Sequence, residues 1–160
     1  ARKEDHAMST DDGSIVLKPG EGKTVPVPGH EVVGADTGGT YSLLECELVG
    51  DGPPQHIDKN EDEAFYVLEG EMNVLVGERS ITATAGSFVF IPRGTVHAFC
   101  RSGQEPAKFL AIFNPAGMEL FFDKAVDLDI TDTEAYVAKA NALAEKYGME
   151  IVGPPLDLSN

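Results

Sequence analysis

The sequence is poor in basic residues, in cysteine and in long apolar runs. It has 12 lysine and arginine residues against 27 aspartate and glutamate residues, a formal net charge of −15. An acidic surface repels the phosphates of nucleic acids and of anionic membranes, so neither is expected as a partner. The two cysteines, Cys46 and Cys100, make no disulfide framework. Each lies in an apolar run, which predicts buried thiols and a reducing, cytoplasmic setting.

No apolar run approaches the roughly 20 residues that cross a bilayer. The N-terminus, ARKEDHAMST, also has no hydrophobic signal-peptide core. A chain of 160 residues is long enough for one domain with a real core and too short for two comfortable ones. We expect an added remnant or disordered tail over residues 1–8, a β-barrel over 9–125, and a C-terminal helix with an extended arm over 126–160.

Short β-type segments separated by turn residues dominate the chain. They cover residues 40–49, 63–69, 72–77, 79–85, 87–92, 95–101 and 108–114. The intervening stretches, such as GDGPP, KNED and PRG, carry typical turn residues. Seven short strands at close spacing predict an antiparallel sandwich, barrel or jelly roll rather than βαβ units. The segment SFVFI within 87–92 is interpreted as a buried strand.

One helix is predicted over residues 131–148, TDTEAYVAKANALAEKYG. Thr131 and Glu134 form a capping box, and Gly148 supplies the C-terminal stop. The apolar stripe consists of Val137, Ala140, Ala144 and Tyr147. We expect the helix to pack on the outside of the barrel. The tail GPPLDLSN should form an extended arm, and an N-terminal edge strand is expected within residues 17–33.

The stretch HIDKNEDEAFYVLEG, residues 56–70, places ionisable residues beside an apolar strand. His56 and Asp58 project from the same side of a strand. KNED favours a turn, so Glu63 begins the next strand and can point back at the same place. In GSFVFIPRGTVHAF, residues 86–99, His97 comes early in the strand after a second turn. Two imidazoles and two carboxylates at separate strand ends suit a divalent metal ion.

These stretches resemble the two motifs of the cupin family. The first motif, G-x5-H-x-H-x3-4-E-x6-G, is matched by Gly50, His56, Glu63 and Gly70. The second, G-x5-P-x-G-x2-H-x3-N, is matched by Gly86, Pro92, Gly94 and His97, with Arg101 in place of the final Asn. Over roughly residues 43–113 the chain is similar to small single-domain cupins of type 2, many of them described as quercetin-dioxygenase-like.

This resemblance implies an all-β protein, a double-stranded β-helix or jelly-roll barrel, here with a C-terminal α-helix. It also implies one divalent metal ion and no nucleotide cofactor. The metal ligands would be His56, Asp58, Glu63 and His97. Because a carboxylate replaces one imidazole of the family pattern, Fe(II), Mn(II), Ni(II) or Zn(II) is favoured over soft Cu(I).

Asp58 departs from the family pattern, which normally has a second histidine there. Asp58 can ligate the metal directly. It can instead accept a hydrogen bond from an imidazole N–H and so orient that ring without touching the metal. His56, Glu63 and His97 would then be the ligands, two histidines and one carboxylate on one face of the ion. In a third interpretation the site has decayed and binds no metal.

Residues in register with the ligands are expected to line a substrate pocket. Phe65 and Val67 lie two and four positions after Glu63 and therefore share its face of the strand. Phe99 and Arg101 share the face of His97 in the same way. Each apolar residue alone fits a barrel core equally well, but together they predict an aromatic-friendly pocket for a small molecule. Arg101 either pairs with a substrate carboxylate or phenolate or extends to the rim.

Three functions remain open. The first is an oxygenase that uses O2 on an aromatic or enediol-type molecule, with Glu63 as ligand or catalytic base. The second is a redox-neutral, metal-dependent cyclase or isomerase of polyketide or sugar-like compounds. The third is a non-catalytic binding protein. Because small cupins commonly pair through barrel edges and terminal arms, the resemblance also implies a homodimer.

Overall fold

The computed structural model describes residues 8–9, 13–24, 29–32, 36–125, 128 and 133–157. The strands are β1 (Met8–Ser9), β2 (Ile15–Val16), β3 (Lys23–Thr24), β4 (Gly29–Val32), β5 (Ser42–Leu48), β6 (Pro54–Asp58), β7 (Asp62–Glu69), β8 (Glu71–Val76), β9 (Arg79–Thr84), β10 (Phe88–Ile91), β11 (His97–Arg101), β12 (Ala107–Asn114) and β13 (Met149–Pro155). The helices are α1 (Glu119–Ala125) and α2 (Thr133–Lys146).

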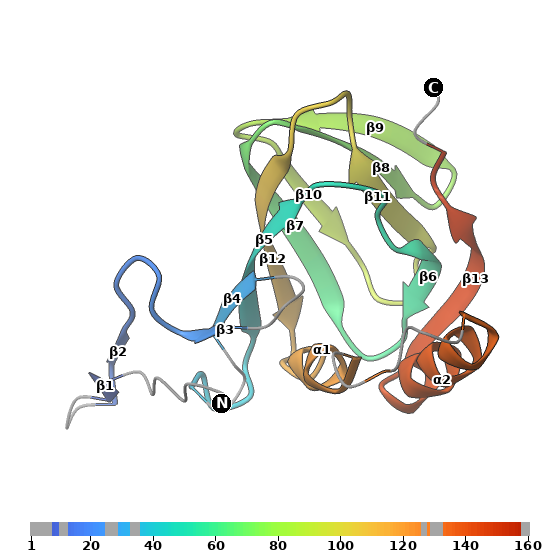
Figure 1. The fold of residues 1–160 in the computed structure, drawn as a ribbon. Helices are drawn as coiled ribbons and strands as arrows, with labels where there is room; N and C mark the ends of the chain where they lie inside the picture. The colour runs from blue at the N-terminus through green and yellow to red at the C-terminus, as the bar shows by residue number, and fades with distance from the viewer. Residues whose placement is uncertain are drawn as a thin grey trace.

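Two antiparallel sheets form the barrel, as Figure 1 shows. One has the strand order β10-β7-β12-β5-β4-β3, and the other has the order β13-β6-β11-β8-β9. Strands β1 and β2 pair with each other in a separate two-stranded sheet. The predicted all-β jelly-roll class with a C-terminal helix is therefore confirmed. No described helix is long and apolar enough to span a membrane.

All seven predicted strands are present, as β5 and as β7 to β12. The expected N-terminal edge strand corresponds to β3 and β4 at the border of the six-stranded sheet. Strands β1, β2 and β13 and helix α1 were not predicted, and β6 was implied only by the placing of His56 and Asp58 on one side of a strand. Strand β6 begins inside the stretch GDGPP that was interpreted as a turn. The expected C-terminal arm is partly strand, because β13 pairs with β6.

The predicted buried strand SFVFI is only half buried. Val89 and Ile91 of β10 face the core, while Phe88 and Phe90 are exposed. Strand β10 has β7 as its one neighbour in the sheet order, and its outward face has no layer packed upon it among the described residues. In a strand with one buried face, residues alternate between core and surface whatever their hydrophobicity.

The predicted helix is α2, which begins at Thr133. The proposed capping residue Thr131 and the side chain of Glu134 lie outside the described residues. Helix α2 packs against β13 and α1, and Figure 1 shows both helices at one end of the barrel. Ala144 is fully buried, but Val137 is exposed, so the predicted stripe is wrong at that position.

Aromatic side chains fill the barrel interior. Phe65, Phe99 and Phe109 make pairwise edge-to-face contacts, with ring centroids between 4.9 and 5.6 Å apart. This geometry favours aromatic pairs because the positive ring edge meets the negative ring face. Cys46 and Cys100 are both buried thiols, as predicted.

Candidate metal centre

The structure brings the four predicted ligands together inside the barrel. His56 and Asp58 point inward from β6, Glu63 from the start of β7, and His97 from the first position of β11. One ligand atom from each residue lies within 4.8 Å of all the others. All four side chains are buried, with between 1 and 4% of each residue exposed.

The cluster joins the two sheets. In the five-stranded sheet, β11 pairs with β6 so that His97 lies opposite His56, and their ring centroids are 4.2 Å apart. Glu63 belongs to the six-stranded sheet, where it lies opposite Ile91 of β10 and Phe113 of β12. Three candidate ligands thus come from one sheet and the fourth from the other.

Backbone carbonyl groups fix the orientation of both imidazoles. His56 Nδ1 lies 2.7 Å from the carbonyl oxygen of Pro54, and His97 Nδ1 lies 2.9 Å from that of Thr95. A carbonyl oxygen only accepts hydrogen bonds, so each Nδ1 must carry the proton and donate it. Nε2 is then the ring atom available to a metal ion, the usual arrangement in histidine metal sites.

The distances around His97 fit a metal site. His97 Nε2 lies 2.8 Å from Glu63 Oε2 and 3.6 Å from Asp58 Oδ2. Two ligand atoms that are each about 2.1 Å from one ion lie about 3.0 Å apart at right angles and about 3.4 Å apart in a tetrahedron.

The two Asp58 oxygens are buried and have no hydrogen-bond partner. Buried carboxylate oxygens are rarely left without partners, because their desolvation costs several kcal/mol. A cation among these four side chains would satisfy both oxygens, so the donor set fits a divalent metal ion.

The electrostatics of the cluster reflect four ionisable groups held away from water. Burial, and then the nearby Glu63 carboxylate, raises the pKa of Asp58 to about 7. Burial also raises the pKa of Glu63, against the opposing hydrogen bond from His97. Burial and the neighbouring His97 lower the pKa of His56 to about 4. For His97, burial alone would lower the pKa, but the hydrogen bond to Glu63 and the nearby carboxylates raise it overall.

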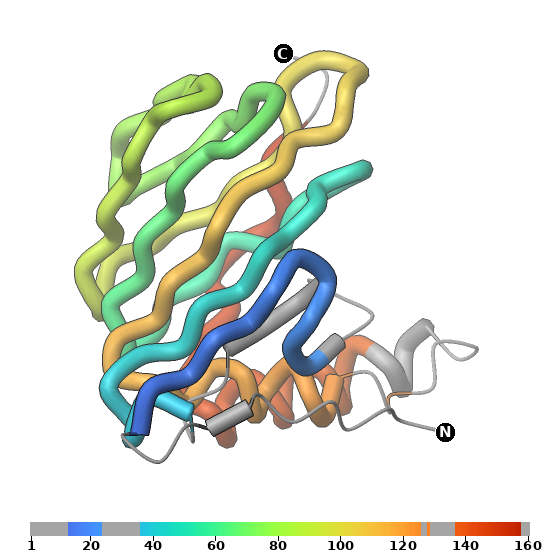
Figure 2. The backbone as a smooth tube through the Cα atoms, turned by 90° about the vertical axis from the view of Figure 1, so that its left-hand side faces the viewer, coloured from blue at the N-terminus to red at the C-terminus, as the bar shows by residue number. Residues whose placement is uncertain are grey.

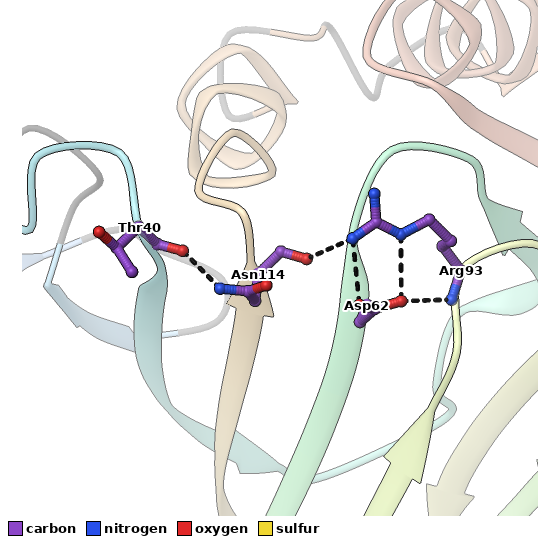
Figure 3. Close-up of polar contacts among 4 residues, drawn as sticks. All are labelled: Thr40, Asp62, Arg93 and Asn114. Carbon is purple, nitrogen blue, oxygen red and sulfur yellow. Dashed lines mark hydrogen bonds and ion pairs between the residues drawn. The ribbon is translucent and has the colours of Figure 1, made fainter.

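A polar brace joins the turn that precedes His97 to the strand that carries Glu63 (Figure 3). Arg93 Nε and Nη2 donate to the two carboxylate oxygens of Asp62 at 3.1 and 3.0 Å. The backbone N–H of Arg93 donates to Asp62 Oδ1 at 2.9 Å. Arg93 Nη2 also donates to the carbonyl of Asn114 at 3.3 Å, and Asn114 Nδ2 donates to the carbonyl of Thr40 at 2.7 Å. Because Arg93 contacts Asp62 through two parallel hydrogen bonds, the pair fixes the orientation of the turn as well as its position.

Two glycines allow the chain to pass close to the site. Gly94 has a φ of +81° and its N–H donates to the carbonyl of Asp58 at 2.8 Å, which holds the P-x-G turn against β6. Its positive φ explains why the motif has glycine there. At Gly52, a Cβ atom would lie 1.5 Å from the carbonyl oxygen of Phe99, so no side chain fits.

The predicted pocket residues lie farther along the same strands. Phe65 and Val67 are fully buried in the hydrophobic core, and Phe99 is half-buried against Phe65. Arg101 is at the opposite end of β11 from His97, where Nη1 donates to the carbonyl of Gln104. Contact between these side chains and a substrate stays a prediction.

Sequence reasoning missed three polar residues beside the cluster. Asp62 and Arg93 form the brace, and Glu61 is buried with its Oε2 lacking a hydrogen-bond partner. Burial raises the pKa of Glu61 to about 7. No residue pattern separated Glu61 and Asp62 from an ordinary charged turn, because both follow the turn-forming pair Lys59 and Asn60.

Parts of this chain are similar to known proteins. The family model described as a cupin domain matches residues 44–113. Quercetin 2,3-dioxygenase from Bacillus subtilis (strain 168) is 30% identical over 118 residues, which cover 69% of this chain and 35% of that protein. Acetate kinase EutQ from Clostridioides difficile (strain 630) is 33% identical over 57 residues, which cover 36% of this chain and 35% of that protein. The chain thus spans 35% of the length of each of these relatives.

Among solved structures, a putative ethanolamine utilization protein Q from Salmonella typhimurium LT2 has a TM-score of 0.55 at 23% identity. The match covers 69% of this chain and 94% of that one, and it shows a likeness of fold. The family match, residues 44–113, runs from within β5 to within β12 and therefore includes all four clustered side chains. The two motifs, the facing sheets and the family match agree, and the chain contains a cupin-type domain.

Proposed function

We propose that this chain is a metal-dependent cupin enzyme that oxidises a small aromatic or enediol-type molecule with O2. The observation that carries the proposal is the buried cluster of two imidazoles and two carboxylates, with both Asp58 oxygens unpartnered. Such mixed nitrogen and oxygen donors suit Fe(II), Mn(II), Ni(II) or Zn(II). The similarity to quercetin 2,3-dioxygenase supports the oxygenase class.

In this proposal, Nε2 of His56, Nε2 of His97 and Oε2 of Glu63 hold the ion, and Asp58 either joins them or balances charge beside them. A bound divalent ion would supply Lewis acidity and, if redox-active, electron transfer to O2. The carbonyls of Pro54 and Thr95 keep both rings aimed at the cluster. The surrounding apolar core excludes water, which strengthens every charge interaction at the site.

Glu63 is the proposed proton acceptor. Its Oε2 lies 2.8 Å from His97 Nε2, and burial raises its pKa above the usual carboxyl range. A carboxylate with a raised pKa is a stronger base toward an acidic substrate hydroxyl such as a phenol or enol. Deprotonating that hydroxyl would give an electron-rich substrate that O2 can oxidise.

The test combines metal analysis with oxygen consumption. Protein purified without chelators should contain about one divalent ion per chain by elemental analysis. An oxygen electrode then records consumption with flavonols and catechols after reconstitution with Fe(II), Mn(II) or Ni(II). Glu63→Gln should abolish consumption, while Glu45→Gln, an exposed carboxylate on β5, should leave it unchanged.

The other functions predict different results. Turnover of a carbonyl or sugar-like substrate under strict anaerobiosis would replace the oxygenase with a redox-neutral cyclase or isomerase. Full ligand affinity in metal-free protein, without turnover, would favour a binding protein. A metal content near zero that no added ion changes would overturn both enzymatic functions.

A further inference from the structure

Ser42, the first residue of β5, is a polar residue at a core position. Its side chain is fully buried, and its hydroxyl group has no hydrogen-bond partner among the described residues. A buried hydroxyl without a partner costs stability that an apolar side chain would not lose. Leu44 and Cys46, the next two inward-facing residues of β5, are apolar and belong to the core. Packing therefore does not explain a serine at this position.

Strand pairing places Ser42 in one row with Glu63 of the candidate metal centre. Ser42 lies opposite Phe113 of β12, and Phe113 lies opposite Glu63 of β7. Residues directly opposite each other in a sheet share a face, and all three are buried. Figure 2 shows β5, β12 and β7 side by side. Two strand spacings separate the Cα atoms of Ser42 and Glu63 by about 10 Å. We call Glu63, Phe113 and Ser42 the site row.

Strands β5 and β7 change from polar to apolar in the same order. Both pair antiparallel with β12, so they run in the same direction. On β7, Glu63 of the cluster is followed two positions later by Phe65 of the core. On β5, Ser42 is followed at the same interval by Leu44 of the core. Ser42 therefore has the position on its strand that a candidate ligand has on β7.

The polar brace of Figure 3 holds the strands together just beyond the site row. Asn114 Nδ2 donates to the carbonyl of Thr40 at 2.7 Å. Arg93 Nη2 donates to the carbonyl of Asn114 at 3.3 Å and to Asp62 Oδ2 at 3.0 Å. These contacts link β7, β12 and the segment that enters β5. The separation between the two polar ends of the row is therefore fixed by the fold.

We propose that the hydroxyl group of Ser42 binds a polar substituent of the substrate, at the end of the molecule that is away from the metal ion. This role of Ser42 rests on the proposed function, in which oxygens at the other end of the substrate bind at the cluster. Inward side chains of a closed barrel converge, so the gap between the hydroxyl and the cluster is shorter than the separation of the Cα atoms. One aromatic ring with a short substituent spans such a gap.

The site row also defines the chemistry of that molecule. Phe113 lies between the two polar ends and offers an apolar contact to a flat ring. Phe122 of α1 is half-buried, with its ring centroid 6.1 Å from that of Phe113, so α1 borders the row. A serine hydroxyl donates and accepts hydrogen bonds but brings no charge. The substrate class is therefore an aromatic or enediol compound with a neutral hydroxyl or carbonyl group opposite its metal-binding oxygens.

Two matched catechols test this role by calorimetric titration of Zn(II)-loaded protein. 4-Ethylcatechol and 4-(2-hydroxyethyl)catechol differ by one hydroxyl group, and Zn(II) is not redox-active, so binding is measured without turnover. Ser42→Ala should weaken binding of the hydroxylated probe about tenfold, because one buried hydrogen bond is lost. It should change binding of 4-ethylcatechol by less than about twofold. Ser80→Ala, the same change at an exposed position on β9, should alter neither affinity.

The stability of the metal-free protein gives a second readout. If the hydroxyl has no partner until a ligand binds, Ser42→Ala removes a desolvation cost and should unfold at the same or a higher urea concentration. Ser42→Cys keeps nearly the same volume but forms only weak hydrogen bonds. It should lose affinity for the hydroxylated probe in the same way, even if Ser42→Ala leaves a small cavity. Metal stoichiometry should be unchanged in both variants.

Three results would overturn this role of Ser42. One is an equal loss of affinity for both catechols in Ser42→Ala, which would show that the serine shapes the site without contacting the substituent. The second is equal affinity of the wild-type protein for the two probes. The third is metal-free Ser42→Ala that unfolds at a clearly lower urea concentration, which would show that the hydroxyl already has a partner such as a buried water.

The same titrations separate this role from the proposed oxygenase activity. A difference between the two probes that depends on Ser42, found in protein that consumes no O2 with any tested metal, would support the role of Ser42 and count against the oxygenase. Consumption of O2 with equal affinity for the two probes would support the oxygenase and overturn the role of Ser42.

Discussion

The two ends of the barrel interior are built by the same strands and have opposite chemistry. On β7, Glu63 belongs to the polar cluster, and two positions later Phe65 belongs to the aromatic core. On β11, His97 is followed at the same interval by Phe99. Since residues two apart share a face, each strand changes from a side chain of the polar cluster to a side chain of the core within about 7 Å. The apolar end excludes water from the polar end, and this exclusion raises the pKa of Asp58 and Glu63.

If the two ends have separate roles, a change at the apolar end should affect stability far more than metal binding. Phe65 is fully buried and contacts both Phe99 and Phe109. Phe65→Ala should lower the free energy of unfolding by about 3–5 kcal/mol, measured by urea denaturation of the metal-free protein. Thr84→Ala, at an exposed position on β9, should change it by less than about 0.5 kcal/mol. Loss of metal stoichiometry from folded Phe65→Ala would show that the two ends are not separable.

A change at the polar end should have the reverse effect. His97→Ala removes one imidazole donor and should weaken divalent metal binding at least about 100-fold by isothermal titration calorimetry. Unfolding of the metal-free variant should be unchanged or need more urea, since a buried ionisable cluster stabilises little without its cation. A variant that binds metal normally would exclude His97 as a ligand.

The sequence predicted the composition of this cluster better than its surroundings. Two motifs with fixed spacing identified His56, Glu63 and His97, because ligand type and strand register are local properties. Arg93 and Asp62 are 31 positions apart, and their contact depends on how one turn docks against another strand. The exposure of Phe88 and Phe90 was also missed, since hydrophobicity alone does not show which face of an edge strand lacks a covering layer. Strand β13 was missed because its residues pair with residues of β6 that are 91 to 101 positions away.

The brace between Arg93 and Asp62 should have a smaller effect, because neither residue lies in the cluster. Arg93→Ala should weaken metal binding about tenfold by loosening the turn that positions His97. Arg93→Lys should recover part of that affinity, since lysine keeps the charge but not the bidentate geometry. The visible spectrum of Co(II)-substituted protein should broaden in Arg93→Ala and sharpen again in Arg93→Lys. Equal affinities and spectra in all three proteins would show that the brace does not position the site.

The pH dependence of stability should differ between metal-free and metal-loaded protein. Burial raises the pKa values of Asp58 and Glu61 to about 7, and the pKa values of Glu63 and His97 are also raised. These groups hold protons more tightly in the folded state, so metal-free protein should lose stability as pH rises through about 7. The effect of His56 has the opposite sign. Its pKa is lowered from 6.5 to about 4 in the folded protein, so its contribution to stability is lost as pH falls below 6.5.

A bound ion replaces those protons, so metal affinity should increase over the same pH range. Melting temperatures at pH 6.5 and pH 8 check both effects: metal-free protein should melt lower at pH 8, and the stabilisation by metal should be larger there. The double variant Asp58→Asn/Glu61→Gln provides the control and should show a flatter dependence. A melting temperature of metal-free protein that rises from pH 6.5 to pH 8 would contradict this assignment.

The smallest loss of metal affinity is expected for Asp58→His, at a position where both carboxylate oxygens lack a hydrogen-bond partner. Asp58→His introduces the imidazole that the cupin motif normally has there, so metal affinity should be kept or increased. Asp58→Ala separates the two remaining roles, because loss of a direct ligand should weaken binding about 100-fold and loss of an outer partner only about tenfold. Calorimetric titration of both variants with Zn(II) measures the difference. Loss of binding in Asp58→His, with binding kept in Asp58→Glu, would show that this position requires a carboxylate. The expectation that histidine can replace aspartate there would then be wrong.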